Sequence, residues 1–117
     1  MQFHEVTYDS AQPVDSYGPG FFRVAGKVVH GPVLVTAETA SAWGGLDDID
    51  SLTALADQID VLFLGMGAEI AHPPAALREA LEEAGIGIEL MGSAAACRTY
   101  NVLIAEGRRI ALAALPV

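Results

Sequence analysis

The residues of this chain that are best suited to hold a ligand lie in two short loops. One loop runs from Gly65 to Glu69 after an apolar segment, and the other spans 91–93 and leads into an alanine-rich segment. Gly65 and Gly67 allow a ligand to approach the backbone closely. Ligands of open α/β sheets bind beyond the carboxyl ends of the parallel strands, where such loops occur. These loops are therefore the candidate binding site.

The same glycines also fit a purely structural role, because a tight exit from a strand needs them. The sequence excludes two nucleotide-binding motifs. A dinucleotide fingerprint requires a third glycine at position 70, where this chain has Ile70, and a helix that begins at the glycines. A P-loop requires the sequence Gly-Lys-Ser or Gly-Lys-Thr, which the chain lacks.

Ser93 is predicted to cap the helix that follows the second loop. The free backbone amides of residues 94–96 would then face any bound anion. The short alanine side chains there would let the helix lie very close to the sheet or to a ligand. A serine that caps its helix and does nothing else satisfies the same pattern.

Polar side chains continue on that helix, where Cys97, Arg98 and Asn101 are expected to cluster on one side. An arginine and an asparagine beside a helix N-terminus are suited to bind a carboxylate or a phosphate. The structural alternative is a buried or half-buried Arg98 that pairs with Glu69 or Glu89. We favour this alternative, because an arginine buried without a partner is costly.

Cys97 is expected to be an inert, buried thiol, since small apolar residues precede it and no base stands at a motif spacing. The chain has no H-E-x-x-H or C-x-x-C spacing, and its acidic stretch does not match a calcium-binding EF-hand loop. We therefore expect no metal and no cofactor. The histidines that could act as a base lie at positions 4, 30 and 72.

Composition indicates a single domain over residues 1–117, with 52% hydrophobic residues and one cysteine. The formal net charge of −9 opposes binding to nucleic acids and to anionic membrane surfaces. The first residues lack the features of a signal peptide, and no apolar stretch is long enough to span a bilayer. These features together predict a cytoplasmic protein without membrane insertion.

The first half of the chain predicts mostly antiparallel strands. Strands are expected at 2–8, at 21–30 with a bend, and at 33–35, with the last two forming a hairpin. A helical turn is expected at 39–43, and a helix from Asp50 or Ser51 to Ile59.

The second half alternates between strands and helices, which favours parallel strands with right-handed crossovers. The whole chain therefore predicts an α/β domain with a mixed sheet, antiparallel in its N-terminal part and parallel in its C-terminal part, with helices packed on it. The expected elements are a strand at 60–64, a helix at 75–84, a strand at 86–91, a helix at 94–105 and a strand at 109–115.

The run Ala95-Ala96-Cys97-Arg98-Thr99-Tyr100-Asn101 closely resembles the signature of the Mth-like domain family, whose biochemical function is unknown. The resemblance extends over nearly the whole chain, through 21–24, 65–67 and 106–109. This chain departs from many members at Pro32 and at Gly92-Ser93, where they carry a serine and an acidic residue with threonine. The second departure removes a carboxylate from the lip of the candidate site.

The resemblance implies a compact α/β domain with no established cofactor or reaction. Mitochondrial members of the family act through protein contacts during assembly of respiratory complex I. We therefore expect a protein-interaction or assembly-type module, with a protein partner or a second copy of the chain. The alternative is an anion-binding protein or an enzyme whose pocket includes Gly65, Gly67, Glu69, Ser93, Cys97, Arg98 and Asn101.

Overall fold

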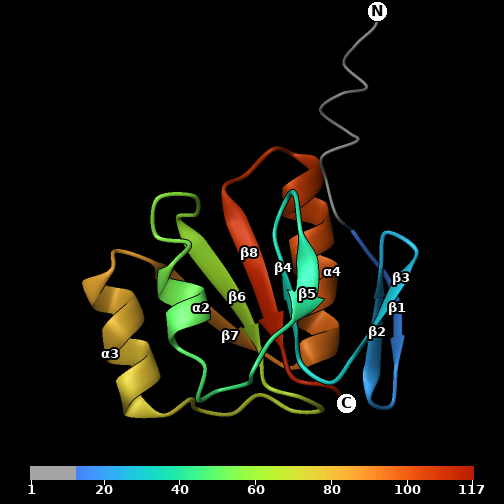
Figure 1. The fold of residues 1–117 in the computed structure, drawn as a ribbon, viewed down its shortest axis with the longest axis horizontal. Helices are drawn as coiled ribbons and strands as arrows, with labels where there is room; N and C mark the ends of the chain where they lie inside the picture. Colours follow the sequence, from blue (N-terminus) through green and yellow to red (C-terminus); the bar gives the residue numbers. More distant parts are fainter. Residues whose placement is uncertain (1–12) are drawn as a thin grey trace, which may run out of the picture.

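A computed structural model describes residues 13–117, which form a five-stranded sheet, a three-stranded sheet and three helices (Figure 1). The predicted α/β class with a mixed sheet is confirmed. The strand expected at 2–8 lies outside the described residues. Of the other predicted elements, several in the first half of the chain are wrong, whereas those in the second half are correct.

The three-stranded sheet is antiparallel and occupies much of the segment in which only turns and a single strand were predicted. The expected strand over 21–30 is in fact a hairpin, so that prediction was wrong. Ala25 and Gly26 have φ values of 48° and 82°, and a two-residue hairpin turn of type I′ requires positive φ at both positions. Its strands are β1 (Val14–Gly18), β2 (Phe21–Val24) and β3 (Lys27–His30).

The next strand does not continue this sheet. Strand β4 (Val33–Val35) pairs with β5 (Ala40–Ala42), where a helical turn was expected, so both the turn and the hairpin between 21–30 and 33–35 are corrected. The helix expected as far as Ile59 is also shorter, because α2 spans only Asp50–Thr53 and turns follow it. Ile59 is nevertheless buried in the core.

The second half agrees with its prediction to within one or two residues. Prolines precede the first of its two helices, and Gly85, at φ 81°, follows that helix closely, as expected of a residue beyond a helix end. The elements are β6 (Val61–Gly65), α3 (Ala75–Glu83), β7 (Gly87–Met91), α4 (Ser93–Ala105) and β8 (Ile110–Ala114).

The strand order of the larger sheet is β5-β4-β8-β6-β7. Strand β6 runs parallel to both of its neighbours, β7 and β8, whereas β4 runs antiparallel to β5 and β8. Strand β8 is thus the seam between the antiparallel and parallel parts. All five of its residues are buried, as expected for a strand covered on both faces.

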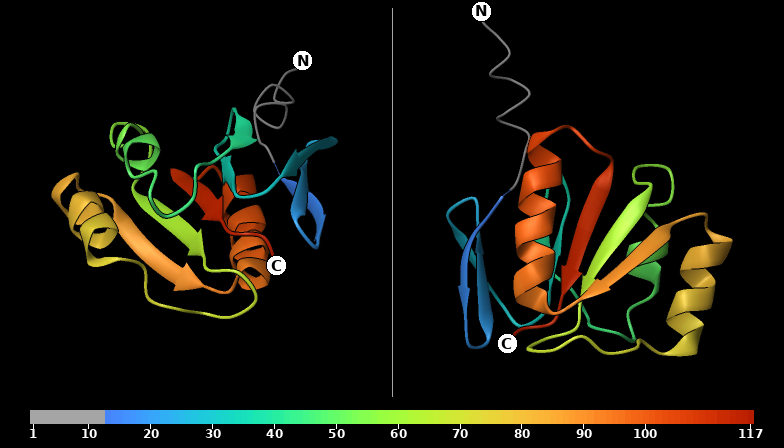
Figure 2. Two further views of the ribbon diagram at one scale, coloured as in Figure 1. Left: turned by 60° about the horizontal axis from the view of Figure 1, so that its bottom comes forward. Right: turned by 180° about the vertical axis from the view of Figure 1, so that it is seen from behind.

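Two hydrophobic cores lie on opposite faces of this sheet (Figure 2). On one face, α4 and the three-stranded sheet pack together against the strands. On the other face, α2 and α3 pack against the strands. Strand β8 serves both, since Leu112 belongs to the first core and its neighbours Ala111 and Ala113 belong to the second.

Replacing Leu112 by alanine tests the role of this central strand. Leu112 is fully buried, so Leu112→Ala should lower the free energy of unfolding by about 2–5 kcal/mol through lost burial and a residual cavity. Urea unfolding measures the change. Val102→Ala is the control, because Val102 is 60% exposed and should shift stability by no more than about 0.5 kcal/mol. Equal effects of the two substitutions would contradict this packing.

Candidate functional site

Ser93 lies at the centre of the candidate site and is almost completely buried. Its hydroxyl oxygen accepts a hydrogen bond from the backbone N–H of Gly67 at 2.9 Å and donates one to the carbonyl of Leu115 at 2.6 Å. The prediction that Ser93 caps α4 is wrong. Gly92 occupies the cap position, and no side chain caps the helix there. Ser93 instead fastens the start of α4 to two strand exits.

Gly65 is needed because α4 begins directly against it. A Cβ atom at this position would lie 2.8 Å from Ser93 Oγ and 2.9 Å from Ser93 Cα. Gly67 has a φ of 95°, a conformation that residues with side chains rarely adopt. The close approach of a helix, and not of a ligand, therefore accounts for the glycine at 65.

Backbone hydrogen bonds join the loops at this end of the sheet to one another. The N–H of Met66 donates to the carbonyl of Met91 at 2.9 Å, and the N–H of Ser93 donates to that of Gly67 at 2.7 Å. The N–H of Leu115 donates to the carbonyl of Gly65 at 2.9 Å. These polar groups, which would otherwise be free to bind a ligand, are already satisfied within the protein.

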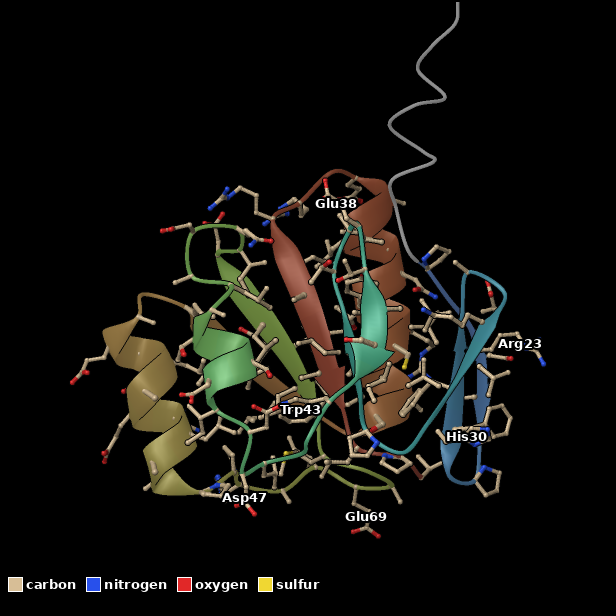
Figure 3. The ribbon with its side chains drawn as sticks, viewed as in Figure 1. Arg23, His30, Glu38, Trp43, Asp47 and Glu69 are labelled. Carbon is tan, nitrogen blue, oxygen red and sulfur yellow. The ribbon has the colours of Figure 1, made fainter. Side chains whose placement is uncertain are left out.

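The structure brings Gly65, Gly67 and Ser93 together as predicted, but it leaves Glu69 outside this cluster. Glu69 is exposed in a loop whose residues 68–72 are all exposed (Figure 3). A carboxylate there is hydrated, and nothing in the surrounding loop holds it toward the strand exits.

Asn101 has a structural role that its sequence position did not reveal. Its side-chain NH₂ donates to the carbonyl of Val14 at 2.8 Å, and its side-chain oxygen accepts from the N–H of Val14 at 2.8 Å. The amide therefore pairs with β1 as a neighbouring strand would. No sequence signal indicated this, because the two residues are separated by 87 positions.

Arg98 is exposed, so the expectation of a buried pair with Glu69 or Glu89 is wrong. Within residues 13–117, the ion pair present is that of Arg109 with Asp60. A helix rotates successive side chains by about 100°, which turns Arg98 into solvent when Cys97 faces the core. Arg98 therefore does not join Cys97 and Asn101 in a common pocket.

Cys97 is buried in the core between α4 and the small sheet, as the sequence indicated. Burial raises the pKa of the Cys97 thiol to about 11, although the charge of Arg98 opposes this shift. The thiol is thus protonated at neutral pH, whereas a nucleophilic cysteine reacts as the thiolate. His30 and His72 are both exposed and supply no base inside this core.

Tyr100 is a further buried polar residue, fully enclosed in the same core. Its hydroxyl has no hydrogen-bond partner within the part of the chain that the structure describes. Burial raises the pKa of Tyr100 well above its usual value, so the phenol stays neutral. Between residues 13 and 117, no three histidine, cysteine or acidic side chains are grouped to hold a metal ion.

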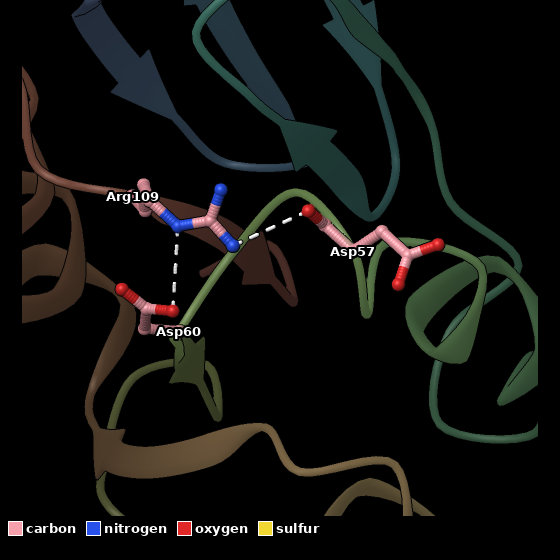
Figure 4. Close-up of polar contacts among 3 residues, drawn as sticks. All are labelled: Asp57, Asp60 and Arg109. Atoms are coloured by element: carbon pink, nitrogen blue, oxygen red, sulfur yellow. Dashed lines mark hydrogen bonds and ion pairs between the residues drawn. The ribbon is translucent and has the colours of Figure 1, made fainter.

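A cavity of about 530 Å³ opens at the opposite end of the sheet, which the sequence did not single out. Arg109 lies at its edge, with Nε donating to Asp60 Oδ1 at 3.4 Å and one terminal nitrogen donating to the carbonyl of Asp57 at 3.2 Å (Figure 4). One feature of the sequence could have pointed to this cavity, namely the consecutive arginines 108 and 109 between a helix end and a strand. The cavity is lined by Thr36, Ala37, Glu38, Asp57, Gln58, Ile59, Gly107, Arg108, Arg109 and Ile110.

Residues 14–115 match the model of a family described as protein of unknown function (DUF498/DUF598). The chain belongs to this family. An uncharacterized protein of Rhodobacter capsulatus is 51% identical over 117 residues, which cover all of this chain and 94% of that protein. NADH dehydrogenase [ubiquinone] 1 alpha subcomplex assembly factor 3 of Danio rerio is 37% identical over 108 residues, covering 86% of this chain. This chain spans 62% of the length of that assembly factor.

Solved structures of other proteins share this fold. A crystal structure described as an outer membrane protein from Bartonella henselae has a TM-score of 0.82 and 34% identity, covering 90% of this chain and 94% of its own. A Mth938-like domain of Bordetella pertussis has a TM-score of 0.77 and 25% identity, covering 99% of this chain and 92% of its own. The Mth-like resemblance is thereby confirmed. No helix within residues 13–117 is long and apolar enough to cross a membrane.

The bridging role of Ser93 predicts the effect of Ser93→Ala. Removing the hydroxyl leaves the Gly67 N–H without its partner in a buried setting, which should cost about 1–3 kcal/mol of unfolding free energy. Denaturant unfolding measures the loss. The matched control is Ser16→Ala on an exposed position of β1, which should be close to neutral. A Ser93→Ala protein as stable as the control would rule out the bridge.

The raised pKa of Cys97 predicts a pH dependence of stability. Between pH 9 and 10 the unfolded chain loses the thiol proton while the folded chain keeps it, so stability should fall as pH rises through this window. Well below pH 9 both states are protonated and the effect vanishes, and the loss of stability is complete above about pH 11, where the folded chain also loses the proton. Unfolding of wild type and Cys97→Ala at a series of pH values tests this, because the variant should lack that part of the slope. Identical slopes would contradict it.

Proposed function

We propose that this protein is a protein-binding module of the assembly-factor type and not an enzyme. The observation that carries the proposal is that the polar groups at the strand exits already form hydrogen bonds within the protein. Ser93 and the backbone of Gly67 bond to each other there, where an α/β enzyme would keep such groups free for its substrate. A rival function as an anion-binding protein or an enzyme at these loops would need those groups released.

The relatives support an assembly role. Besides the Danio rerio protein, assembly factor 3 of Drosophila melanogaster is 34% identical over 114 residues that cover 88% of this chain and 58% of that protein. Those names describe proteins that are longer than this chain. We therefore propose a shared mode of action, in which the domain binds a partner protein during assembly of a larger complex.

An exposed apolar side chain supports a contact surface. Ile70 is 66% exposed, the highest value among the exposed large apolar side chains of residues 13–117. It projects from the 68–72 loop, beside Glu69. We therefore propose that the 68–72 loop around Ile70 forms the contact with the partner.

We further propose that the protein acts in the cytoplasm. The single cysteine is a free, buried thiol, which fits a reducing compartment. Fractionation of native cells, with the protein followed by an antibody, tests this proposal. Recovery of the protein with the membrane pellet after high-salt washing would overturn it.

Deletion of the gene tests the assembly role. We expect native gels of the deletion strain to show less assembled respiratory NADH dehydrogenase and an accumulated subcomplex that contains the protein when it is restored. Crosslinking and mass spectrometry then identify the contacted subunit. Normal amounts of the assembled enzyme, together with no crosslink to any of its subunits, would refute the proposal.

Ile70→Asp gives a residue-level prediction for this proposal. The substitution places a charge on the proposed contact without touching the core, so the melting temperature should stay the same while partner capture falls by about tenfold or more. Val102→Asp, on the exposed face of α4, is the matched control and should capture the partner normally. Undiminished capture by Ile70→Asp would exclude the 68–72 loop as the contact.

A further inference from the structure

The 530 Å³ cavity lies where β6 and β8 begin, at the end of the sheet away from the loops around Ser93. Residues of three connections line this open cavity, namely the turn between β4 and β5, the turns before β6, and the turn between α4 and β8. Its volume falls within the range of about 300–1,000 Å³ that is usual for sites of small ligands. The cavity is separate from the loops that the sequence singled out.

The lining combines an apolar base with charged walls. Ile59 and Ile110 are both buried and contribute the apolar surface, next to Ala37. Glu38 lies in the β4–β5 turn, at the upper end of the view in Figure 3. Arg108 and Arg109 come from the α4–β8 turn. Side chains of opposite charge therefore reach the same cavity from different connections.

Two hydrogen bonds orient Arg109. Its Nε bonds Asp60, and one terminal nitrogen bonds the carbonyl of Asp57, whose carboxylate points away from the guanidinium in Figure 4. The third nitrogen points away from both partners and keeps its donors free of bonds to them. The Arg109 and Asp60 side chains are 54% and 70% exposed, so their ion pair is weak and does not prevent a second carboxylate from binding.

Arg108, Glu38 and Asp57 are the cavity-lining residues with unpaired charges. All three are exposed, and none forms an ion pair with any residue from 13 to 117. Groups of opposite sign that share a cavity without pairing leave their charges available to a ligand. A ligand with a net negative charge would be repelled by the protein's net charge of −9, whereas a net-neutral ligand would not.

We propose that this cavity binds a small zwitterion of the amino-acid type. The ligand carboxylate bonds Arg108 and the free nitrogen of Arg109, since a guanidinium is the preferred partner of a carboxylate. The ligand ammonium group bonds Glu38 on the facing connection. The ligand side chain lies over Ile59 and Ile110. This site is independent of the proposed partner surface at Ile70.

The test uses the isotope-labelled full chain and the twenty common amino acids in pools at about 10 mM each, a concentration that detects even millimolar dissociation constants. We expect at least one pool to shift the backbone amide signals of residues 36–38, 57–59 and 107–110. The N-acetyl and carboxamide derivatives of the active amino acid should each bind about tenfold more weakly, because each lacks one of the two charges. No shifts in these segments with any pool would overturn the proposal.

Variants separate a built site from general charge effects. Arg108→Gln and Glu38→Gln should each raise the dissociation constant by about tenfold without changing the melting temperature, since both side chains are exposed. Arg98→Gln is the control, because it removes the same charge from the exposed surface of α4 outside the cavity lining. An equal loss with Arg98→Gln, or unchanged binding by derivatives that lack one charge, would overturn the assignment.

Discussion

The contact between Gly65 and Ser93 is the constraint on which the rest of the structure depends. Helix α4 begins so close to β6 that any side chain at position 65 would meet the helix backbone. This approach lets one serine hydroxyl join the exits of β6 and β8. It also sets α4 against the sheet along its length, so that Tyr100 and Ile104 become part of the core beneath the small sheet. The same interaction that organises the fold thus uses the polar groups expected to bind a ligand.

The second half of the chain was predictable because its signals are local. Prolines before α3, glycine after it, and a short apolar run for β6 each reflect the conformation of neighbouring residues. The first half was not predictable, because its strands pair with distant segments and one of its turns is unusual. Alanine at position 25 with positive φ gives no sequence warning of a hairpin. Strand β4 does not join the sheet of the strands before it, and besides β5 it pairs with the distant strand β8.

The candidate site was likewise only partly predictable from the sequence. Sequence reasoning placed Gly65, Gly67 and Ser93 together correctly, since strand exits in a parallel sheet meet at one edge. It could not tell whether their polar groups face a ligand or one another. Arg98 was misjudged because helical spacing gives angular positions but not which side faces the core. The cavity at Arg109 escaped notice because three separate connections form it, and none of them carries a motif.

The pairing of Asn101 with Val14 has a consequence for how the chain is made. Synthesis proceeds from the N-terminus, so β1 and β4 emerge long before α4 and β8, to which they attach. Until residues 93–114 leave the ribosome, the apolar sides of these early strands have no surface to cover them. Contacts between such distant segments make folding slow and leave the nascent chain open to aggregation. The chain would thus present uncovered strands for most of its own translation.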